Sequence, residues 1–151
     1  MKVIFLDIDG VLITRLDCLN RRTHGPPEKP RVDLLNQLLL STDAKIVVSS
    51  SWRVGRTPKQ LGKLLTSWGV IPGRVIDKTG HGMTRGEEIQ EWLGEHPTVT
   101  SFIVIDDDVF DMGNILPRVV KTTFVDGLLP EHVEMAIKIL EAYLQPNTDQ
   151  P

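Results

Sequence analysis

A pair of aspartates at the end of a strongly apolar run constrains this chain more than any other feature. Residues 3–6, Val-Ile-Phe-Leu, form a continuous apolar stretch of the kind expected for a strand buried on both faces of a parallel sheet. Asp7 and Asp9 follow it, and Gly10 comes next. Because open α/β sheets bind ligands at the carboxyl ends of their strands, the pair marks a candidate ligand site.

Two carboxylates this close repel each other, so both stay ionised near neutral pH only where a cation or a strong hydrogen-bond network compensates them. A hard ion that prefers oxygen ligands is the matching partner, with Mg²⁺ first. The alternative is a local role, in which Asp7 and Asp9 cap a helix or form a turn, because Asp before Gly is common turn chemistry. The rest of the chain favours the metal.

Strand-like and helix-like stretches alternate along the chain. This pattern predicts a three-layer α/β/α sandwich around a central, mostly parallel, five-stranded Rossmann-like sheet. The expected strands cover residues 3–6, 45–48, 74–77, 102–105 and 119–125. The expected helices cover residues 31–41, 58–68, 84–96 and 130–144. Residues 11–30 lack periodicity and contain three prolines, so we expect a loop there.

Length and composition limit the class of protein. The 151 residues fit one domain, over residues 1–145, with a frayed tail at 146–151. No apolar run approaches the ~20 residues that span a bilayer, and the chain begins with a strand rather than a signal peptide. The single cysteine, Cys18, cannot form an internal disulfide, which favours a reducing compartment and a cytoplasmic protein.

The net charge of −3 conceals an asymmetry along the sequence. Residues 1–85 carry 14 Lys and Arg against 7 acids, whereas residues 86–151 carry 3 against 13. Basic residues follow the first two strands, at Arg15, Arg21, Arg22, Lys29, Arg31, Arg53, Arg56, Lys59 and Lys63. Lys and Arg in loops beside the candidate ligand site would attract a polyanion such as a nucleic acid, or they form a solvated face, and the sequence leaves both interpretations open.

Acidic and hydroxyl side chains follow three of the predicted strands. Asp7 and Asp9 end the first, Ser49 ends the second, and residues 106–108 place three aspartates after the apolar run at 102–105. In a parallel sheet these ends lie on one edge, so we expect the side chains to converge. A bound metal would remove the repulsion within such a cluster.

These motifs together resemble the haloacid dehalogenase-like hydrolases. The resemblance spans nearly the whole chain and rests on DIDGVL at 7–12, the Ser at 49, a basic residue before the third helix and DDDVFD at 106–111. It implies that Asp7 is a nucleophile that forms an aspartyl-phosphate and that Asp9 is the general acid and base. An Asp at position 9 is similar to the phosphatases and phosphomutases of the family.

The same resemblance implies a Mg²⁺ site made by Asp7, the backbone carbonyl of Asp9, and Asp107 with Asp106 in support. Ser49 would hydrogen-bond a phosphoryl oxygen, with Ser50 or Ser51 replacing it if the strand ends later. Arg85 fits the place of the basic residue that neutralises the phosphate, and Lys78 is the alternative. The expected substrate-binding residues are Gly10, Ser50, Trp52, Arg53 and Asp111.

The chain has room for no large cap domain, because only about 20 residues follow the first strand before the next helix. An open site suits a substrate with its own bulk. The stretches SSSWR and RGEEIQEWL also resemble, more loosely, the phosphatase modules of nucleic acid repair proteins, including polynucleotide 3′-phosphatases. Trp52 would stack a base or pack against a neighbouring helix, two interpretations that the sequence leaves open.

The leading hypothesis is a Mg²⁺-dependent phosphomonoesterase acting on DNA or RNA ends, with 3′-phosphates favoured, or on nucleotides. One alternative is a capless phosphatase for sugar phosphates or small nucleotides that completes its site by oligomerising. The other is a module that binds nucleic acid or protein without catalysis, although such a module has no need for an intact acid at Asp9.

Overall fold

A computed structural model describes residues 1–20 and 26–142 of the chain. Five strands form one sheet in the order β3-β2-β1-β4-β5, and every neighbouring pair is parallel. The strands are β1 (Lys2–Leu6), β2 (Lys45–Val48), β3 (Val75–Lys78), β4 (Ser101–Asp106) and β5 (Val119–Lys121). The predicted parallel α/β sheet is confirmed, and the strand that precedes Asp7 lies at its centre.

Helices alternate with these strands. They are α1 (Arg15–Asn20), α2 (Lys29–Thr42), α3 (Pro58–Ser67), α4 (Arg85–Glu95) and α5 (Pro130–Ala142), with short 3₁₀ helices η1 (Ser51–Arg53) and η2 (Gly113–Arg118). Thr57 begins α3 with a capping box that includes Gln60, and the Thr84 hydroxyl accepts a hydrogen bond from the N–H of Glu87 at the start of α4. None of the described helices is long and apolar enough to cross a membrane.

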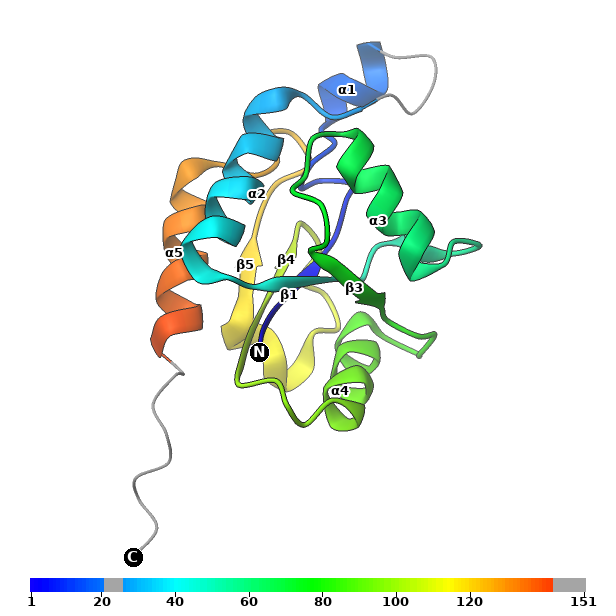
Figure 1. The fold of residues 1–151 in the computed structure, drawn as a ribbon, viewed down its shortest axis with the longest axis vertical. Coiled ribbons are helices and arrows are strands. Elements are labelled where there is room, and N and C mark those ends of the chain that lie inside the picture. Colours follow the sequence, from blue (N-terminus) through cyan, green and yellow to red (C-terminus); the bar gives the residue numbers. More distant parts are fainter. Residues whose placement is uncertain (21–25, 143–151) are drawn as a thin grey trace, which may run out of the picture.

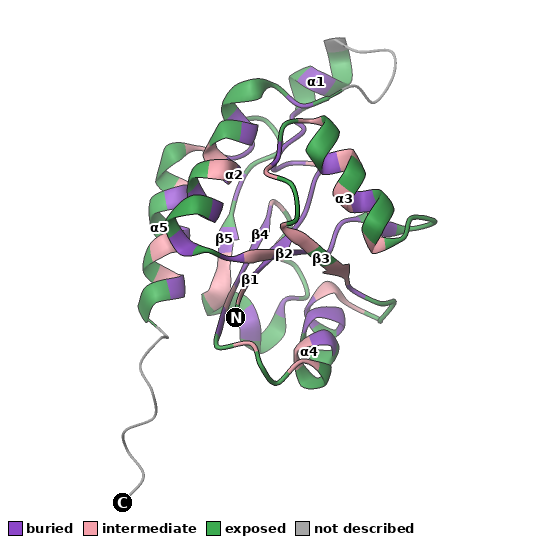
Figure 2. Cartoon of the chain, viewed as in Figure 1, coloured by how far each residue is buried: buried purple, intermediate pink, exposed green. Residues whose placement is uncertain are grey.

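Helices cover both faces of the sheet (Figure 1). One apolar cluster joins α2, α3 and α5 to one face, through buried residues such as Leu35, Leu61 and Val133. A smaller cluster on the other face joins α4 and η2 to the sheet, through Ile89 and Met112. In Figure 2 the three central strands β2, β1 and β4 are mostly buried, the edge strands β3 and β5 are partly buried, and the helices are exposed on their outer sides. The core therefore buries both faces of the central strands and leaves their ends open to polar groups.

The structure corrects two predictions about elements. Residues 15–20 form the short helix α1 rather than part of a loop, and Asp17 accepts hydrogen bonds from the backbone N–H and hydroxyl of Thr14 at its start. Strand β5 ends at Lys121, because the chain then turns through a bridge between Thr123 and Gly127. Arg21, Arg22 and the tail predicted to fray at 146–151 lie outside the described residues.

Candidate active site

Three carboxylates converge at the carboxyl ends of the two central strands. Asp7 directly follows β1, Asp106 ends β4, and Asp107 comes next. The pairing of Leu6 with Ile105 fixes this register. One oxygen from each carboxylate lies within 4.8 Å of the others, as the parallel sheet predicted.

Burial raises the free-energy cost of keeping these carboxylates ionised. Asp7 is 8% exposed and Asp106 is 2% exposed. Burial, and next the neighbouring Asp106 carboxylate, raise the pKa of Asp7 from 3.8 to about 8. Burial also raises the pKa of Asp106. Both groups therefore favour a proton or a cation over an uncompensated charge.

Arg85 supplies the positive charge that faces this cluster. It is the first residue of α4, and its Nη1 lies 3.1 Å from Oδ2 of Asp106 and 3.9 Å from Oδ1 of Asp7. Its guanidinium lowers the pKa of both carboxyl groups, against the larger effect of burial. On its other side, Nε lies 3.8 Å from Oε2 of the buried Glu88. The geometry thus holds the guanidinium between the acid cluster and Glu88.

Lys78, the alternative to Arg85, has its ammonium elsewhere. Its Nζ donates hydrogen bonds of 3.2 Å and 2.6 Å to the carbonyls of Arg53 and Arg56. The structure therefore brings Arg85, rather than Lys78, to the carboxylates.

Arg53, which the sequence predicted as a substrate-binding residue, lies inside the protein. Its side chain is buried and donates hydrogen bonds to the carbonyls of Ser50, Thr79 and Gly80. Its Nη2 also lies 3.0 Å from Oε2 of Glu88. Arg53 thus ties the turn after β2 to the loop before α4, and it holds the carboxylate that neighbours Arg85.

The three serines after β2 differ sharply in access to the site. Ser49 and Ser50 are fully buried; the Ser49 hydroxyl has no hydrogen-bond partner, and that of Ser50 accepts from the N–H of Trp52. Ser51 is exposed and lines the cavity above the acid cluster. The strand ends where predicted, but the 3₁₀ turn that follows places the third serine, and not Ser49, at the cavity.

Asp9 lines the same cavity, and its position is set by Trp52. The indole N–H of Trp52 donates a 3.1 Å hydrogen bond to Oδ2 of Asp9. The ring packs edge to face against Trp68, the residue that follows α3, with centroids 5.4 Å apart, and the guanidinium carbon of Arg56 lies 5.4 Å from the Trp52 ring centroid. Of the two interpretations of Trp52, the structure favours packing against a helix.

Comparison with known proteins identifies the family. Residues 3–133 match the family model described as the HAD domain in Swiss Army Knife RNA repair proteins. The chain belongs to this HAD family. The resemblance to haloacid dehalogenase-like hydrolases and to nucleic acid repair modules is thereby confirmed. Comparisons with curated proteins and with solved structures gave no match.

Gly10, the last residue of the DxDG segment in this HAD domain, is required by both its backbone and its surroundings. Its φ of +83° favours glycine. A Cβ atom at this position would lie 2.3 Å from Cγ of Asp107. The Gly10 carbonyl accepts a 2.6 Å hydrogen bond from the hydroxyl of Thr122 after β5. Gly10 therefore allows Asp107, a candidate metal ligand, to pack directly on the chain.

A second glycine of the HAD domain, Gly86, positions Arg85. A Cβ at Gly86 would lie 2.5 Å from the carbonyl oxygen of Met112, so only glycine lets α4 approach the loop after β4 this closely. Its N–H bonds to the carbonyl of Asp111. Asp111 has a φ of 62° and lines a different cavity, beside the start of α4. The structure thus does not bring Asp111 to the acid cluster, where substrate binding was predicted.

The donor set of this HAD domain fits a hard cation. Carboxylate oxygens lie close together in the cluster of Asp7, Asp106 and Asp107. The pKa values of Asp7 and Asp106 are raised, and a bound cation would lower them again. The side chain of Asp9 is not part of this cluster. The residues present therefore suit Mg²⁺.

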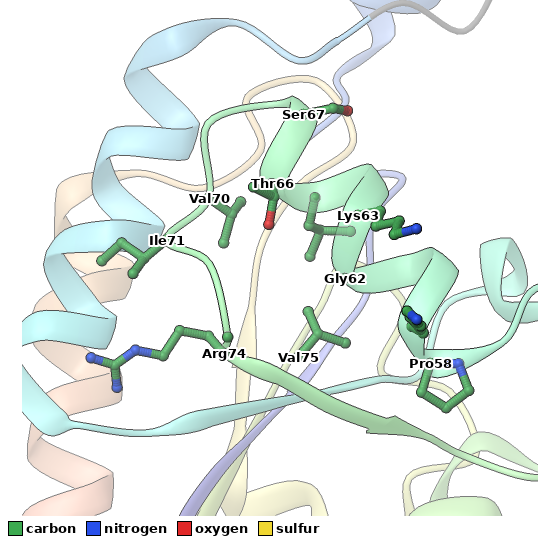
Figure 3. A pocket seen from close by; sticks show the side chains of 12 residues that line it. Pro58, Gly62, Lys63, Thr66, Ser67, Val70, Ile71, Arg74 and Val75 are labelled. Carbon is green, nitrogen blue, oxygen red and sulfur yellow. The ribbon is translucent and has the colours of Figure 1, made fainter.

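The cavity at the acid cluster is about 370 Å³ and is lined by two aromatic residues that sequence reasoning missed. Its lining is Asp7, Asp9, Ser51, Arg85, Asp106, Asp107, Asp108, Phe110 and Phe124. A larger cavity of about 580 Å³ lies between α3 and β3 (Figure 3), but it has no acidic residue in its lining. The sequence contains no signal that separates Phe110 and Phe124 from core aromatics, since exposure follows only from the fold.

Proposed function

We propose that this HAD domain is a Mg²⁺-dependent phosphomonoesterase that works through an aspartyl-phosphate on Asp7. The observation that carries the proposal is the cluster of Asp7, Asp106 and Asp107 joined by Arg85 at one open cavity. The proposed substrates are phosphorylated nucleic acid ends, with 3′-phosphates favoured. The family description, which names RNA repair proteins, supports this class and favours RNA.

In the first step a carboxylate oxygen of Asp7 attacks phosphorus, and the bond from phosphorus to the departing sugar oxygen breaks. Asp9, protonated, gives its proton to that oxygen. Arg85 and the Ser51 hydroxyl hold the phosphoryl oxygens as charge develops. Because the pKa of Asp7 is raised to about 8, this nucleophile would be mostly protonated near neutral pH unless a cation compensates the cluster.

In the second step the Asp9 carboxylate removes a proton from water, whose oxygen attacks the phosphorus of the aspartyl-phosphate. The acyl phosphate bond breaks, which releases phosphate and returns Asp7 to its carboxylate form. The metal, held by Asp7, Asp106, Asp107 and the Asp9 carbonyl, would supply positive charge to the phosphoryl group and keep the carboxylates ionised.

A screen of phosphate release tests the proposal. It compares oligonucleotides with 3′- or 5′-phosphates, nucleotides, sugar phosphates and phosphopeptides, each with Mg²⁺ or EDTA. We expect phosphate release from oligonucleotide ends, and EDTA should abolish it. Asp7→Asn should lower its rate at least about 1000-fold, as for other covalent nucleophiles. Undiminished turnover by Asp7→Asn would refute the proposal.

Two other results of the screen would favour the alternatives. Tight binding of oligonucleotides without release would indicate a binding module. Preference for small phosphates by a stable oligomer would indicate a small-molecule phosphatase.

A further inference from the structure

Two phenylalanines stand exposed at the rim of the catalytic cavity. Phe110 is 78% exposed and Phe124 is 38% exposed, although most large apolar side chains of the sheet and helices are buried. Phe110 lies in the loop after β4 and Phe124 in the loop after β5, and both line the cavity that holds Asp7 and Asp9. Two separate loops thus bring aromatic rings to one polar site.

Hydrogen bonds anchor Phe110 to the acid cluster. Its N–H donates a 2.9 Å hydrogen bond to Oδ1 of Asp108. The N–H of Asp108 in turn donates a 3.0 Å hydrogen bond to Oδ1 of the buried Asp106. The segment that contains Asp106 and Asp107, the candidate metal ligands, therefore also positions the backbone of Phe110.

The loop of Phe124 is anchored to the other side of the site. Thr122 bonds to the carbonyl of Gly10, directly after Asp9. The Phe124 carbonyl accepts a 2.9 Å hydrogen bond from the N–H of Arg15, the first residue of α1. Both rings are thus carried by backbone segments tied to the catalytic residues.

The chemistry of the rim limits what it would bind. The floor of the cavity is charged and suits a phosphoryl group with its cation, whereas the two rings offer flat, uncharged surface beside it. A group attached to a phosphate bound at the carboxylates would therefore lie in a cavity that these two aromatic side chains also line. A nucleobase fits this surface because every base has a π-face that stacks on aromatic side chains.

We propose that Phe110 and Phe124 form a stacking site for the terminal nucleobase next to the phosphate that is removed. This inference rests on the proposed phosphatase function and deepens it, because it assigns recognition of the nucleic acid end to these rings. It selects a base-bearing substrate over a sugar phosphate. It makes no demand on base identity, since stacking tolerates all four bases.

The test compares two oligoribonucleotides with a 3′-phosphate, one with a normal terminal nucleotide and one with an abasic terminal ribose. The holoprotein with Mg²⁺ is measured by kcat and KM on each. We expect the wild-type kcat/KM to favour the base-bearing end by about 5-fold to 100-fold, the range that base–aromatic stacking spans, mostly through KM. Phe110→Ala and Phe124→Ala should each move that ratio toward one.

Conservative variants separate stacking from general apolar contact. Phe110→Tyr should keep the preference for the base-bearing end, whereas Phe110→Leu should lose most of it. The control is Leu40→Ala on α2, which removes a similarly exposed apolar side chain, 69% exposed, away from the cavity. It should leave the ratio of kcat/KM for the two ends unchanged. Unchanged thermal unfolding of each Phe variant confirms that the fold is intact.

The outcomes distinguish this inference from the proposed function. Phosphate release from both ends with a ratio near one would overturn the stacking site and leave the phosphatase proposal standing. No release from either end would overturn the phosphatase proposal itself. A phosphotyrosine peptide hydrolysed better than the base-bearing end, with loss in Phe110→Ala, would assign the rings to a protein substrate and overturn the nucleobase.

Discussion

The indole N–H of Trp52 donates a 3.1 Å hydrogen bond to Oδ2 of Asp9, across 43 positions of the sequence. Trp52 lies in η1 after β2, whereas Asp9 follows β1. The ring is itself packed against Trp68. Trp52, in the segment that follows the neighbouring strand β2, therefore orients the side chain of Asp9, which is proposed to carry the proton. This hydrogen bond yields the first prediction.

Trp52→Phe should lower kcat about 10-fold, because it removes one hydrogen bond to a charged group while keeping an aromatic ring. The loss should be larger for an alkyl phosphate than for p-nitrophenyl phosphate, because only the poor leaving group needs a proton. Trp68→Phe, which keeps the bond to Asp9, is the control. The comparison uses kcat/KM, which reports the first step, because Asp9 also acts in the second step on an intermediate that both substrates share. An equal loss of kcat/KM for both substrates would show that Trp52 acts on stability rather than on Asp9.

Removal of metal should make stability depend on pH. The pKa of Asp7 is raised to about 8 in the folded chain, from 3.8, so folding takes up a proton between these values. This contribution is fully present below pH 3.8 and is lost as the pH rises through 8. In EDTA the urea midpoint should therefore be lower at pH 8.5 than at pH 5.5.

Mg²⁺ should remove most of that decline, because the cation replaces the proton at the cluster. Asp7→Asn has no titrating group at this position and should flatten the profile in EDTA. A wild-type urea midpoint that rises between pH 5.5 and pH 8.5 in EDTA would contradict the predicted sign.

Gly10→Ala should weaken Mg²⁺ binding about 10-fold or more, because the added Cβ would lie 2.3 Å from the carboxylate carbon of Asp107. The matched control is Gly73→Ala, whose φ of +79° carries the same backbone cost with no atom within 4 Å of the new Cβ. Isothermal titration with Mg²⁺ measures both. A Mg²⁺ affinity of Gly10→Ala equal to that of Gly73→Ala would show that the contact with Asp107 does not govern metal binding.

Glu88→Gln should destabilise the fold by about 3 kcal/mol, because it leaves the buried Arg53 without its carboxylate partner, 3.0 Å away. Glu87→Gln, one position earlier and exposed, is the control and should change the free energy of unfolding by less than about 0.5 kcal/mol. Chemical denaturation measures both. A neutral effect of Glu88→Gln would mean that the carbonyls around Arg53 suffice for its charge.

The sequence predicted what depends on local pattern and on parallel topology. Apolar runs located the strands. Because parallel strands end on one edge of a sheet, the sequence also predicted that Asp7 lies near Asp106 and Asp107. Helix α1 escaped prediction because its six residues are too few to show a period. Boundaries near Ser49 were correct to the residue.

What the sequence did not reveal depends on distant partners. In the sequence, Arg53 resembles an exposed basic residue after a strand. Its burial is explained by distant partners, the carboxylate of Glu88, 35 positions later, and the carbonyl of Thr79. Ser51 replaced Ser49 at the cavity because a 3₁₀ turn changes the direction of successive side chains. The exposure of Phe110 likewise follows from the loop and not from residue type.

The central place of β1 has a consequence for synthesis. Its Lys2 pairs with Ser101, so the ribosome makes this strand long before one of its two neighbours exists. Until β4 emerges, the growing chain presents one unpaired edge of an apolar strand, the kind of edge on which nascent chains associate wrongly or recruit chaperones. The same event that closes this edge brings Asp7 to Asp106. Nascent chains that stop before β4 should therefore hold neither a finished sheet nor a metal site, and the two should arise together.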